Sequence, residues 1–234
     1  MTVRRALRYE HVAFDLDGTL ADTRADLAAA TNHVLRSFGL AEIPPRSVYR
    51  LVGEGARRLV ERALGPERET CVDEGVGRFL DYYAAHLLDA TTLYPGVAQA
   101  LDALAEHGVT LTVLSNKPEG MSRTVLDGLG VLGRFRALVG GDSLPTRKPH
   151  PAGLESLCRL TATPRDAMLL VGDSAIDVAT AANAHIDFCG VAWGLDPDAL
   201  RATHPPCMID SPAELVTLVV DGQAVRGARA SSAS

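Results

Sequence analysis

Residues 11–20 read HVAFDLDGTL, and this stretch decides the fold. Its apolar run, residues 11–15, ends in Asp15, and a second carboxylate, Asp17, follows two positions later. A strand that is covered on both faces of a parallel sheet is apolar throughout, so the run is typical of a buried strand whose carboxyl end opens onto a site. The stretch therefore predicts an α/β protein with polar chemistry at one edge of its sheet.

The same design recurs along the chain. Four further apolar runs of strand length lie at residues 111–115, 137–141, 167–172 and 188–192. Helical patterns long enough to cross back over a sheet separate the runs, at residues 96–107, 118–129 and 150–160. Strands that alternate with helices in this way predict a doubly wound parallel sheet.

One segment, residues 22–90, breaks the alternation. It holds helical patterns at residues 26–38, 56–64 and 67–88, and it contains no convincing strand. We therefore predict an all-helical unit of residues 22–90, inserted after the first strand of a core that is made of residues 1–21 and 91–221. The last residues, 222–234, are small and polar, and we expect them to be disordered.

The composition is that of an ordinary globular protein. The chain has 29 acidic and 23 basic side chains and a net charge of -6, which disfavours nucleic acid as a partner. No apolar run approaches the roughly 20 residues of a membrane helix, and the four cysteines show no zinc-binding spacing. We expect a cytoplasmic monomer or homodimer with free thiols and no membrane partner. Among the basic residues only Lys117 and Lys148 are lysines.

Polar residues follow the ends of the predicted strands. The carboxyl ends of parallel strands share one edge of a sheet, where ligands bind in open α/β folds, so these residues should converge. They are Asp15, Asp17, Gly18 and Thr19 after the first run, Ser115, Asn116 and Lys117 after the second, Lys148 in the loop after the third, and Gly172, Asp173 and Asp177 after the fourth.

Converging carboxylates repel one another unless a cation lies between them, and oxygen ligands predict Mg²⁺. A hydroxyl of Ser115 or Thr19, the amide of Asn116 and the ammonium of Lys148 would then bind an anionic group such as phosphate. Asp15 could attack phosphorus, and Asp17 could protonate the leaving oxygen.

Four segments together resemble the motifs of the haloacid dehalogenase superfamily in order and spacing. They are residues 15–20 (DLDGTL), the pair Ser115-Asn116, Lys148, and residues 172–177 (GDSAID). The resemblance spans about residues 12–220 and implies a Rossmann-type core, with residues 22–90 similar to the C1 cap of that superfamily. Residues 26–35, 51–65 and 94–104 further resemble phosphoglycolate phosphatases.

The resemblance implies a role for each motif residue. Asp15 would become an aspartyl-phosphate, and Asp17 would act as general acid and then as the base that activates water. Mg²⁺ would be held by Asp15, the backbone carbonyl of Asp17, Asp173, and Asp177 directly or through water. The phosphoryl oxygens would be held by Ser115 and Asn116, next to Gly18 and Thr19, while Lys148 offsets charge. The implied activity is Mg²⁺-dependent hydrolysis of 2-phosphoglycolate.

Several alternatives stay open at this point. The substrate could be another small phosphate compound, such as a sugar phosphate or pyrophosphate. The enzyme could instead be a phosphomutase. The protein could also be a phospholigand sensor without catalysis. A cap arginine, with Arg57 and Arg58 the first candidates, would pair with the carboxylate of phosphoglycolate, unless both lie on a solvated helix face. Lys117 would point to solvent or toward the cap.

Overall fold

A six-stranded parallel sheet lies at the centre of the computed structural model, which describes residues 7–221. Its strands are β1 (His11–Phe14), β4 (Thr110–Leu114), β5 (Ala137–Val139), β6 (Met168–Gly172), β7 (Asp187–Val191) and β8 (Met208–Ile209). They lie in the order β5-β4-β1-β6-β7-β8, and every neighbouring pair is parallel. The chain starts at a central strand, builds out to one edge and returns to build the other, which confirms the predicted doubly wound sheet. The predicted disordered tail, residues 222–234, lies outside the described residues.

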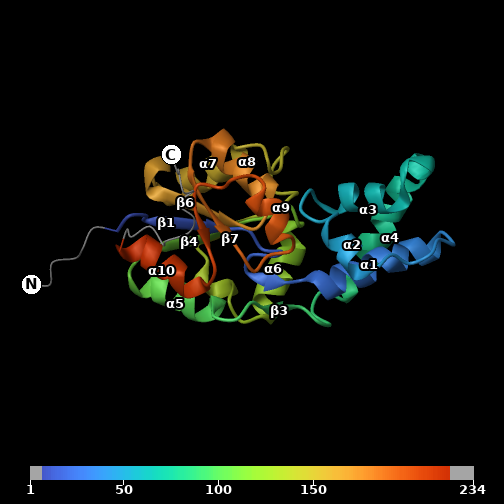
Figure 1. The fold of residues 1–234 in the computed structure, drawn as a ribbon, viewed down its shortest axis with the longest axis horizontal. Helices are drawn as coiled ribbons and strands as arrows, with labels where there is room; N and C mark the ends of the chain where they lie inside the picture. The colour runs from blue at the N-terminus through green and yellow to red at the C-terminus, as the bar shows by residue number, and fades with distance from the viewer. Residues whose placement is uncertain (1–6, 222–234) are drawn as a thin grey trace, which may run out of the picture.

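Successive residues of each strand face two separate cores. In β1, Val12 and Phe14 pack into one core and Ala13 packs into the other. The first face of the sheet is covered by α5 (Val97–Glu106), α6 (Glu119–Gly128) and α10 (Pro212–Asp221), and the second by α7 (Ala152–Thr161) and α8 (Ala175–Ala184) (Figure 1). Because both faces are covered, the strands are mostly apolar, and the buried His11 of β1 and Thr112 of β4 satisfy each other by a hydrogen bond of 2.7 Å.

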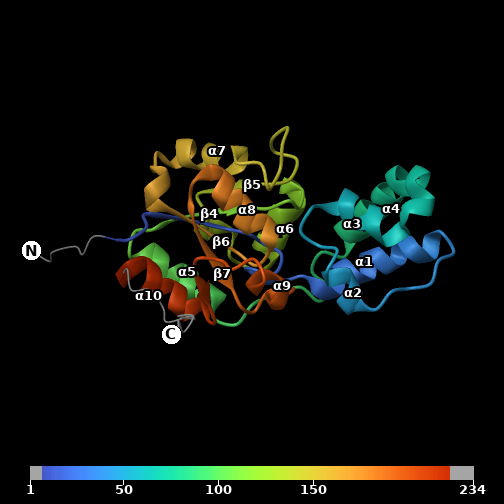
Figure 2. The same ribbon diagram turned by 45° about the horizontal axis from the view of Figure 1, so that its top comes forward.

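Four helices pack together beside the sheet, at the carboxyl end of β1 (Figure 2). This helical unit consists of α1 (Arg24–Ser37), α2 (Pro45–Tyr49), α3 (Ala56–Leu64) and α4 (Val72–Ala85). The helical pattern predicted at residues 67–88 forms in two parts, a 3-10 turn at Pro66–Cys71 and then α4. Gly65, with a φ of 77°, ends α3, and Pro66 cannot continue a helix from it.

Two short strands carry the chain between the sheet and the helical unit. β2 (Ala21–Asp22) and β3 (Thr92–Leu93) pair in antiparallel fashion. The sequence predicted no strand within residues 22–90, yet Asp22 belongs to β2, because a strand of two residues is too short to produce a periodic pattern. Close by, the buried carboxylate of Asp26 on α1 accepts hydrogen bonds from the backbone N–H groups of Ala90 and Thr91, at 3.0 and 2.9 Å. It thereby ties the first helix of the unit to the segment that returns to the sheet.

The cysteines are free thiols, as predicted from their spacing. Cys158 and Cys189 are buried, and Cys71 and Cys207 are half-buried. In residues 7–221, none of the helices combines the length and the apolar character that crossing a membrane requires.

Replacing Asp26 by alanine should lower the free energy of unfolding by about 2 kcal/mol, because two buried backbone donors and the hydroxyl of Thr91 lose a charged acceptor. Urea unfolding followed by circular dichroism measures the change. The matched control is Asp81→Ala on the exposed side of α4, which should change the stability by less than about 0.5 kcal/mol. An Asp26 variant as stable as this control would show that the carboxylate does not hold the two segments together.

Candidate active site

The carboxyl ends of β1, β4 and β6 meet beside the helical unit and are followed by Asp15, Ser115 and Asp173. These side chains line a cavity of about 340 Å³. Across the cavity, the helical unit contributes mainly apolar side chains, among them Leu59 of α3 and Phe79 of α4. The structure thus brings together residues from three strand ends that are far apart in the sequence and faces them with the inserted helices.

Asp15, Asp173 and Asp177 form a buried acidic cluster, in which one carboxylate oxygen of each residue lies within 4.8 Å of the others. Burial raises the pKa of Asp15 to about 7, and the charge of Asp177 acts in the same direction against that of Lys148. Burial and then the charge of Asp15 raise the pKa of Asp173 well above its ordinary value. A cation among the three carboxylates would remove this penalty, and a donor set made only of oxygens fits Mg²⁺.

Two glycines let the backbone approach the cluster. Gly18 has a φ of 86°, and a Cβ atom built on it would lie 2.1 Å from Asp173 Oδ2. A Cβ atom on Gly194 would lie 2.3 Å from Asp173 Cβ. The side chain of Asp173 therefore fits between two loops only because both of these positions lack a side chain. Gly18, predicted near the phosphoryl group, serves the site through this close approach.

Lys148 reaches the cluster from the loop between β5 and α7, and its side chain is 2% exposed. Its Nζ lies 2.8 Å from Asp15 Oδ1 and 2.7 Å from Asp177 Oδ1. Burial acts to lower the pKa of Lys148, but the charges of Asp15 and Asp177 outweigh it and raise the pKa. The backbone N–H of Leu16 also donates to Asp15 Oδ1, at 2.7 Å. Within the described residues, the hydrogen bond and the ion pair of the Asp15 carboxylate thus both involve Oδ1, and Oδ2 is the oxygen that could react with a ligand.

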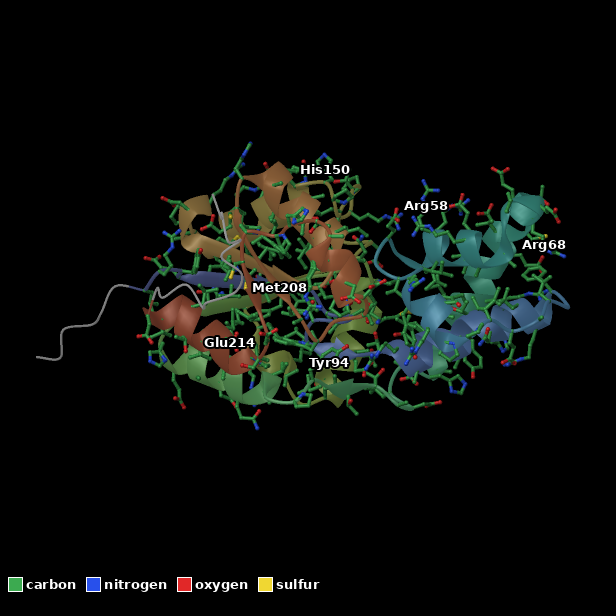
Figure 3. The ribbon with its side chains drawn as sticks, in the orientation of Figure 1. Arg58, Arg68, Tyr94, His150, Met208 and Glu214 are labelled. Carbon is green, nitrogen blue, oxygen red and sulfur yellow. The ribbon has the colours of Figure 1, made fainter. Side chains whose placement is uncertain are left out.

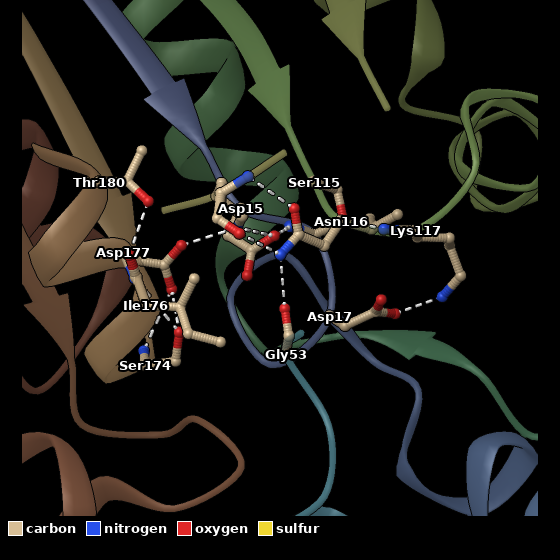
Figure 4. A network of polar contacts seen from close by, with 12 residues as sticks. Asp15, Asp17, Gly53, Ser115, Asn116, Lys117, Ser174, Ile176, Asp177 and Thr180 are labelled. Carbon is tan, nitrogen blue, oxygen red and sulfur yellow. Dashed lines mark hydrogen bonds and ion pairs between the residues drawn. The ribbon is translucent and has the colours of Figure 1, made fainter. Parts of the chain in front are cut away.

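Asn116 organises the loop that carries Lys148. Its Oδ1 accepts a hydrogen bond from the backbone N–H of Lys148 at 2.9 Å. Its Nδ2 donates to the carbonyl oxygens of Lys148 and of Gly53, at 3.0 and 2.9 Å (Figure 4). Both amide hydrogens are therefore engaged, so the side chain predicted to bind phosphate instead links the lysine loop to the helical unit. Ser115, whose Oγ accepts from the backbone N–H of Lys117 at 3.2 Å, keeps its own hydroxyl hydrogen for a ligand.

Asp177 engages protein groups with both of its carboxylate oxygens. Oδ1 accepts from Lys148, and Oδ2 accepts from the backbone N–H and the hydroxyl of Ser174, at 3.2 and 2.6 Å. Ser174 in turn caps the first turn of α8, so the two residues form a capping box. Asp177 is thereby fixed at the start of a helix, with Lys148 held against it.

Thr19 lies away from the cavity. Its hydroxyl is buried without a hydrogen-bond partner among the described residues, and its side chain lines a small apolar pocket beside α5 and Trp193. The reason is the turn after Gly18, which directs residue 19 to the covered face of the sheet. The structure thus does not support Thr19 as a phosphate ligand.

The two arginines proposed from the sequence also lie away from the cavity. Arg57 pairs with Asp73, and Arg58 pairs with Glu61 at 2.7 Å, and both arginines are exposed. Figure 3 labels Arg58 on the outer side of the helical unit. Of the residues that the structure describes, the arginines that line the cavity are Arg50 and Arg62. Arg62 lies on the same helix, one turn beyond Arg58, and lines the cavity that Arg57 and Arg58 do not line.

Two further residues, Lys117 and Tyr83, line the cavity, and neither was assigned a role from the sequence. Lys117 is buried and forms an ion pair with Asp17, and its Nζ also donates to the hydroxyl of Tyr83 of α4, at 2.8 Å. Lys117 thus points toward the helical unit and not to solvent, which settles the alternative that the sequence left open. Two signals in the sequence pointed to Lys117: the rarity of lysine in this chain and its place directly after Ser115 and Asn116 at the end of a predicted strand.

Comparisons with known proteins agree with this geometry. Residues 12–191 match the family model of the haloacid dehalogenase-like hydrolases. Over 212 residues the chain is 38% identical to a phosphoglycolate phosphatase of Rhodospirillum rubrum, with 87% of this chain and 88% of that one covered. It is 34% identical to a phosphoglycolate phosphatase of Agrobacterium fabrum, with 93% and 95% covered.

A solved structure described as a "predicted phosphoglycolate phosphatase", from Haemophilus somnus 129pt, has the same fold. Its TM-score is 0.83 at 30% sequence identity, and the match covers 90% of this chain and 98% of that one. Family model, relatives and fold therefore coincide with the four motifs and the acidic cluster. The chain belongs to the haloacid dehalogenase-like hydrolase family.

Proposed function

We propose that the protein is a Mg²⁺-dependent phosphatase that hydrolyses 2-phosphoglycolate to glycolate and phosphate. The observation that carries the proposal is the buried contact of Lys148 with Asp15 beside two further carboxylates, at one end of a cavity. A carboxylate can attack a phosphate ester only where cations offset the negative charge of both groups. The substrate is inferred from the names of the relatives, and the free thiols suit a reduced, cytoplasmic compartment.

In the proposed reaction, Oδ2 of Asp15 attacks phosphorus, and the bond between phosphorus and the leaving oxygen breaks. Asp17 gives its proton to that oxygen, which leaves as the hydroxyl of glycolate. Water then attacks the phosphorus of the aspartyl-phosphate while Asp17 takes up a proton, so that phosphate is released and Asp15 is restored. Lys148 offsets charge near Oδ1, and the hydroxyl of Ser115 donates to a phosphoryl oxygen.

The acidic cluster is the proposed metal site. Asp15, Asp173 and the backbone carbonyl of Asp17 would hold Mg²⁺, with Asp177 acting directly or through water. When bound, the ion supplies positive charge against the phosphoryl oxygens. The raised pKa values of Asp15 and Asp173 support a cation at this place, since both carboxylates are buried close to like charges.

The helical unit, residues 22–90, is proposed to act as a cap that excludes water and selects the leaving group. Its side of the cavity is largely apolar, and the volume of about 340 Å³ falls within the range of pockets for ligands larger than phosphoglycolate. This observation favours a larger phosphate ester as the second candidate substrate.

Phosphate release from 2-phosphoglycolate, sugar phosphates, nucleotides and pyrophosphate tests the proposal directly. We expect the highest kcat/KM for 2-phosphoglycolate with Mg²⁺ and loss of activity in EDTA that added Mg²⁺ restores. Asp15→Asn should retain the fold and lose at least about a thousandfold in kcat, because an amide is a poor nucleophile. A preference for another ester would overturn the assignment of the substrate, and an active Asp15→Asn enzyme would overturn the assignment of Asp15 as the nucleophile.

Lys148→Arg should be nearly as damaging to kcat as Lys148→Ala, although it preserves the charge. The ammonium lies less than 3 Å from two carboxylates in a buried space, and a planar guanidinium is too wide to replace it there. The measurement is kcat of both variants at saturating Mg²⁺, with the melting temperature as a check on folding. An arginine variant near the wild-type rate would show that the site requires only positive charge.

Arg62 is the proposed partner for the carboxylate of phosphoglycolate, because it lines the cavity. It forms an ion pair with Glu54, which also lines the cavity, and the carboxylate of the substrate could take the place of Glu54. Arg62→Ala should raise KM for 2-phosphoglycolate about tenfold, as expected for losing about 1.4 kcal/mol of charge-assisted hydrogen bonding. KM for p-nitrophenyl phosphate, which lacks a carboxylate, should change little. Arg58→Ala, on the same helix but away from the cavity, is the matched control, and equal effects of the two variants would contradict the assignment.

A further inference from the structure

Lys117 joins the two parts of the molecule at the proposed acid. It follows β4 in the core, and its Nζ contacts Asp17 Oδ1 on one side and the hydroxyl of Tyr83 on the other, the latter at 2.8 Å. The same Nζ lies 4.9 Å from the centre of the Tyr83 ring. Tyr83 belongs to α4 of the helical unit, so one side chain of the core spans from the loop after β1 to the proposed cap.

This lysine is held in a defined position by its burial. The side chains of Lys117 and Asp17 are 3% and 13% exposed, and Tyr83 is 2% exposed. A buried ammonium is costly unless its hydrogens find acceptors, and here the carboxylate and the phenol supply them. Removing either acceptor leaves a buried donor unsatisfied, so the three groups are expected to move together.

The contact also determines where the carboxylate of Asp17 lies. Asp17 and Asp15 are two residues apart, yet the side chain of Asp17 extends toward Lys117 and away from the contacts of Asp15 with Lys148 (Figure 4). Both Asp17 and Tyr83 line the cavity, on the side where the helical unit faces the core. In the proposed reaction the leaving group occupies this space.

We propose that Lys117 and Tyr83 are positioning residues, which hold the carboxylate of Asp17 at the leaving oxygen and make its placement depend on the helical unit. The inference rests on the proposed function, because it takes Asp17 as the group that protonates the leaving oxygen while the bond from that oxygen to phosphorus breaks. Lys117 and Tyr83 contribute no proton of their own. Their effect is therefore confined to esters whose leaving group needs a proton.

The test compares Tyr83→Phe with wild type on two substrates. This variant removes one hydroxyl and keeps the ring. We expect kcat for 2-phosphoglycolate to fall about tenfold, whereas kcat for p-nitrophenyl phosphate, whose leaving phenolate needs no proton, should fall less than about threefold. KM should change less than about twofold for both substrates. Lys117→Met should show the same preference with a larger loss, and in the double variant the losses should not multiply, because Tyr83 acts through Lys117.

Tyr82→Phe is the matched control. Tyr82 precedes Tyr83 on α4, but its ring stacks between His33 and His86, at centroid distances of 4.3 and 4.2 Å. This variant should keep both activities. Losses of equal size on the two substrates, no loss in Tyr83→Phe, or fully multiplicative losses in the double variant would overturn the inference.

The outcome separates this inference from the proposed function. If the wild type hydrolyses another alkyl phosphate but not 2-phosphoglycolate, the substrate assignment fails, and the same comparison is made with that ester. A wild type that hydrolyses no phosphate ester overturns both. Normal turnover of alkyl and aryl esters by Tyr83→Phe overturns only the positioning role.

Discussion

The burial of three carboxylates around one point is the constraint on which the rest of the structure depends. Asp15, Asp173 and Asp177 come from two strand ends and a helix start, and a single ammonium, that of Lys148, contacts two of them. Like charges at this distance are costly in a buried setting, so each carboxylate needs donors that fix it. The close approach at Gly18, the capping box at the start of α8 and the loop held by Asn116 all serve that need.

The helical unit contacts the core beside this cluster, in addition to its connections through β2 and β3. Asn116 donates to the carbonyl of Gly53, in the loop between α2 and α3, and Lys117 donates to Tyr83 of α4, so two consecutive residues after β4 both contact the helical unit. Most of the remaining cavity wall on that side is apolar, and apolar contacts do little to orient the helical unit. Hydrogen bonds depend on distance and angle more sharply than apolar contacts do, so these two bonds restrict how the helical unit can lie over the strand ends.

The parts of the site that follow from chain connectivity were predictable. The end-of-strand rule collected Asp15, Ser115 and Asp173 correctly, because the carboxyl ends of parallel strands must share an edge. The rule could not say which way a side chain turns once the strand has ended, and for this reason Thr19 faces the core of the sheet domain.

Residues of the helical unit were harder to place. The boundaries of α3 at residues 56–64 were predicted correctly, since Gly55 and Gly65 flank it. Which part of its surface faces the cavity depends on packing between elements that are distant in the sequence, so the sequence pointed to Arg57 and Arg58, whereas Arg62 lines the cavity. The role of Lys117 was hidden for the same reason, because Tyr83 lies 34 residues away along the chain.

The single tryptophan of the chain, Trp193, lies beside the loop after β1. The indole N–H of Trp193 donates to the carbonyl oxygen of Thr19 at 3.1 Å, and the backbone N–H of Leu195, two residues on, donates to Asp173 Oδ2 at 2.9 Å. The indole is thus connected to the loop after β1 and to a carboxylate of the cluster. Because no second indole contributes to the signal, the tryptophan fluorescence of this protein originates beside the acidic cluster. Trp193 is therefore an intrinsic fluorescent probe of the carboxyl ends of the strands.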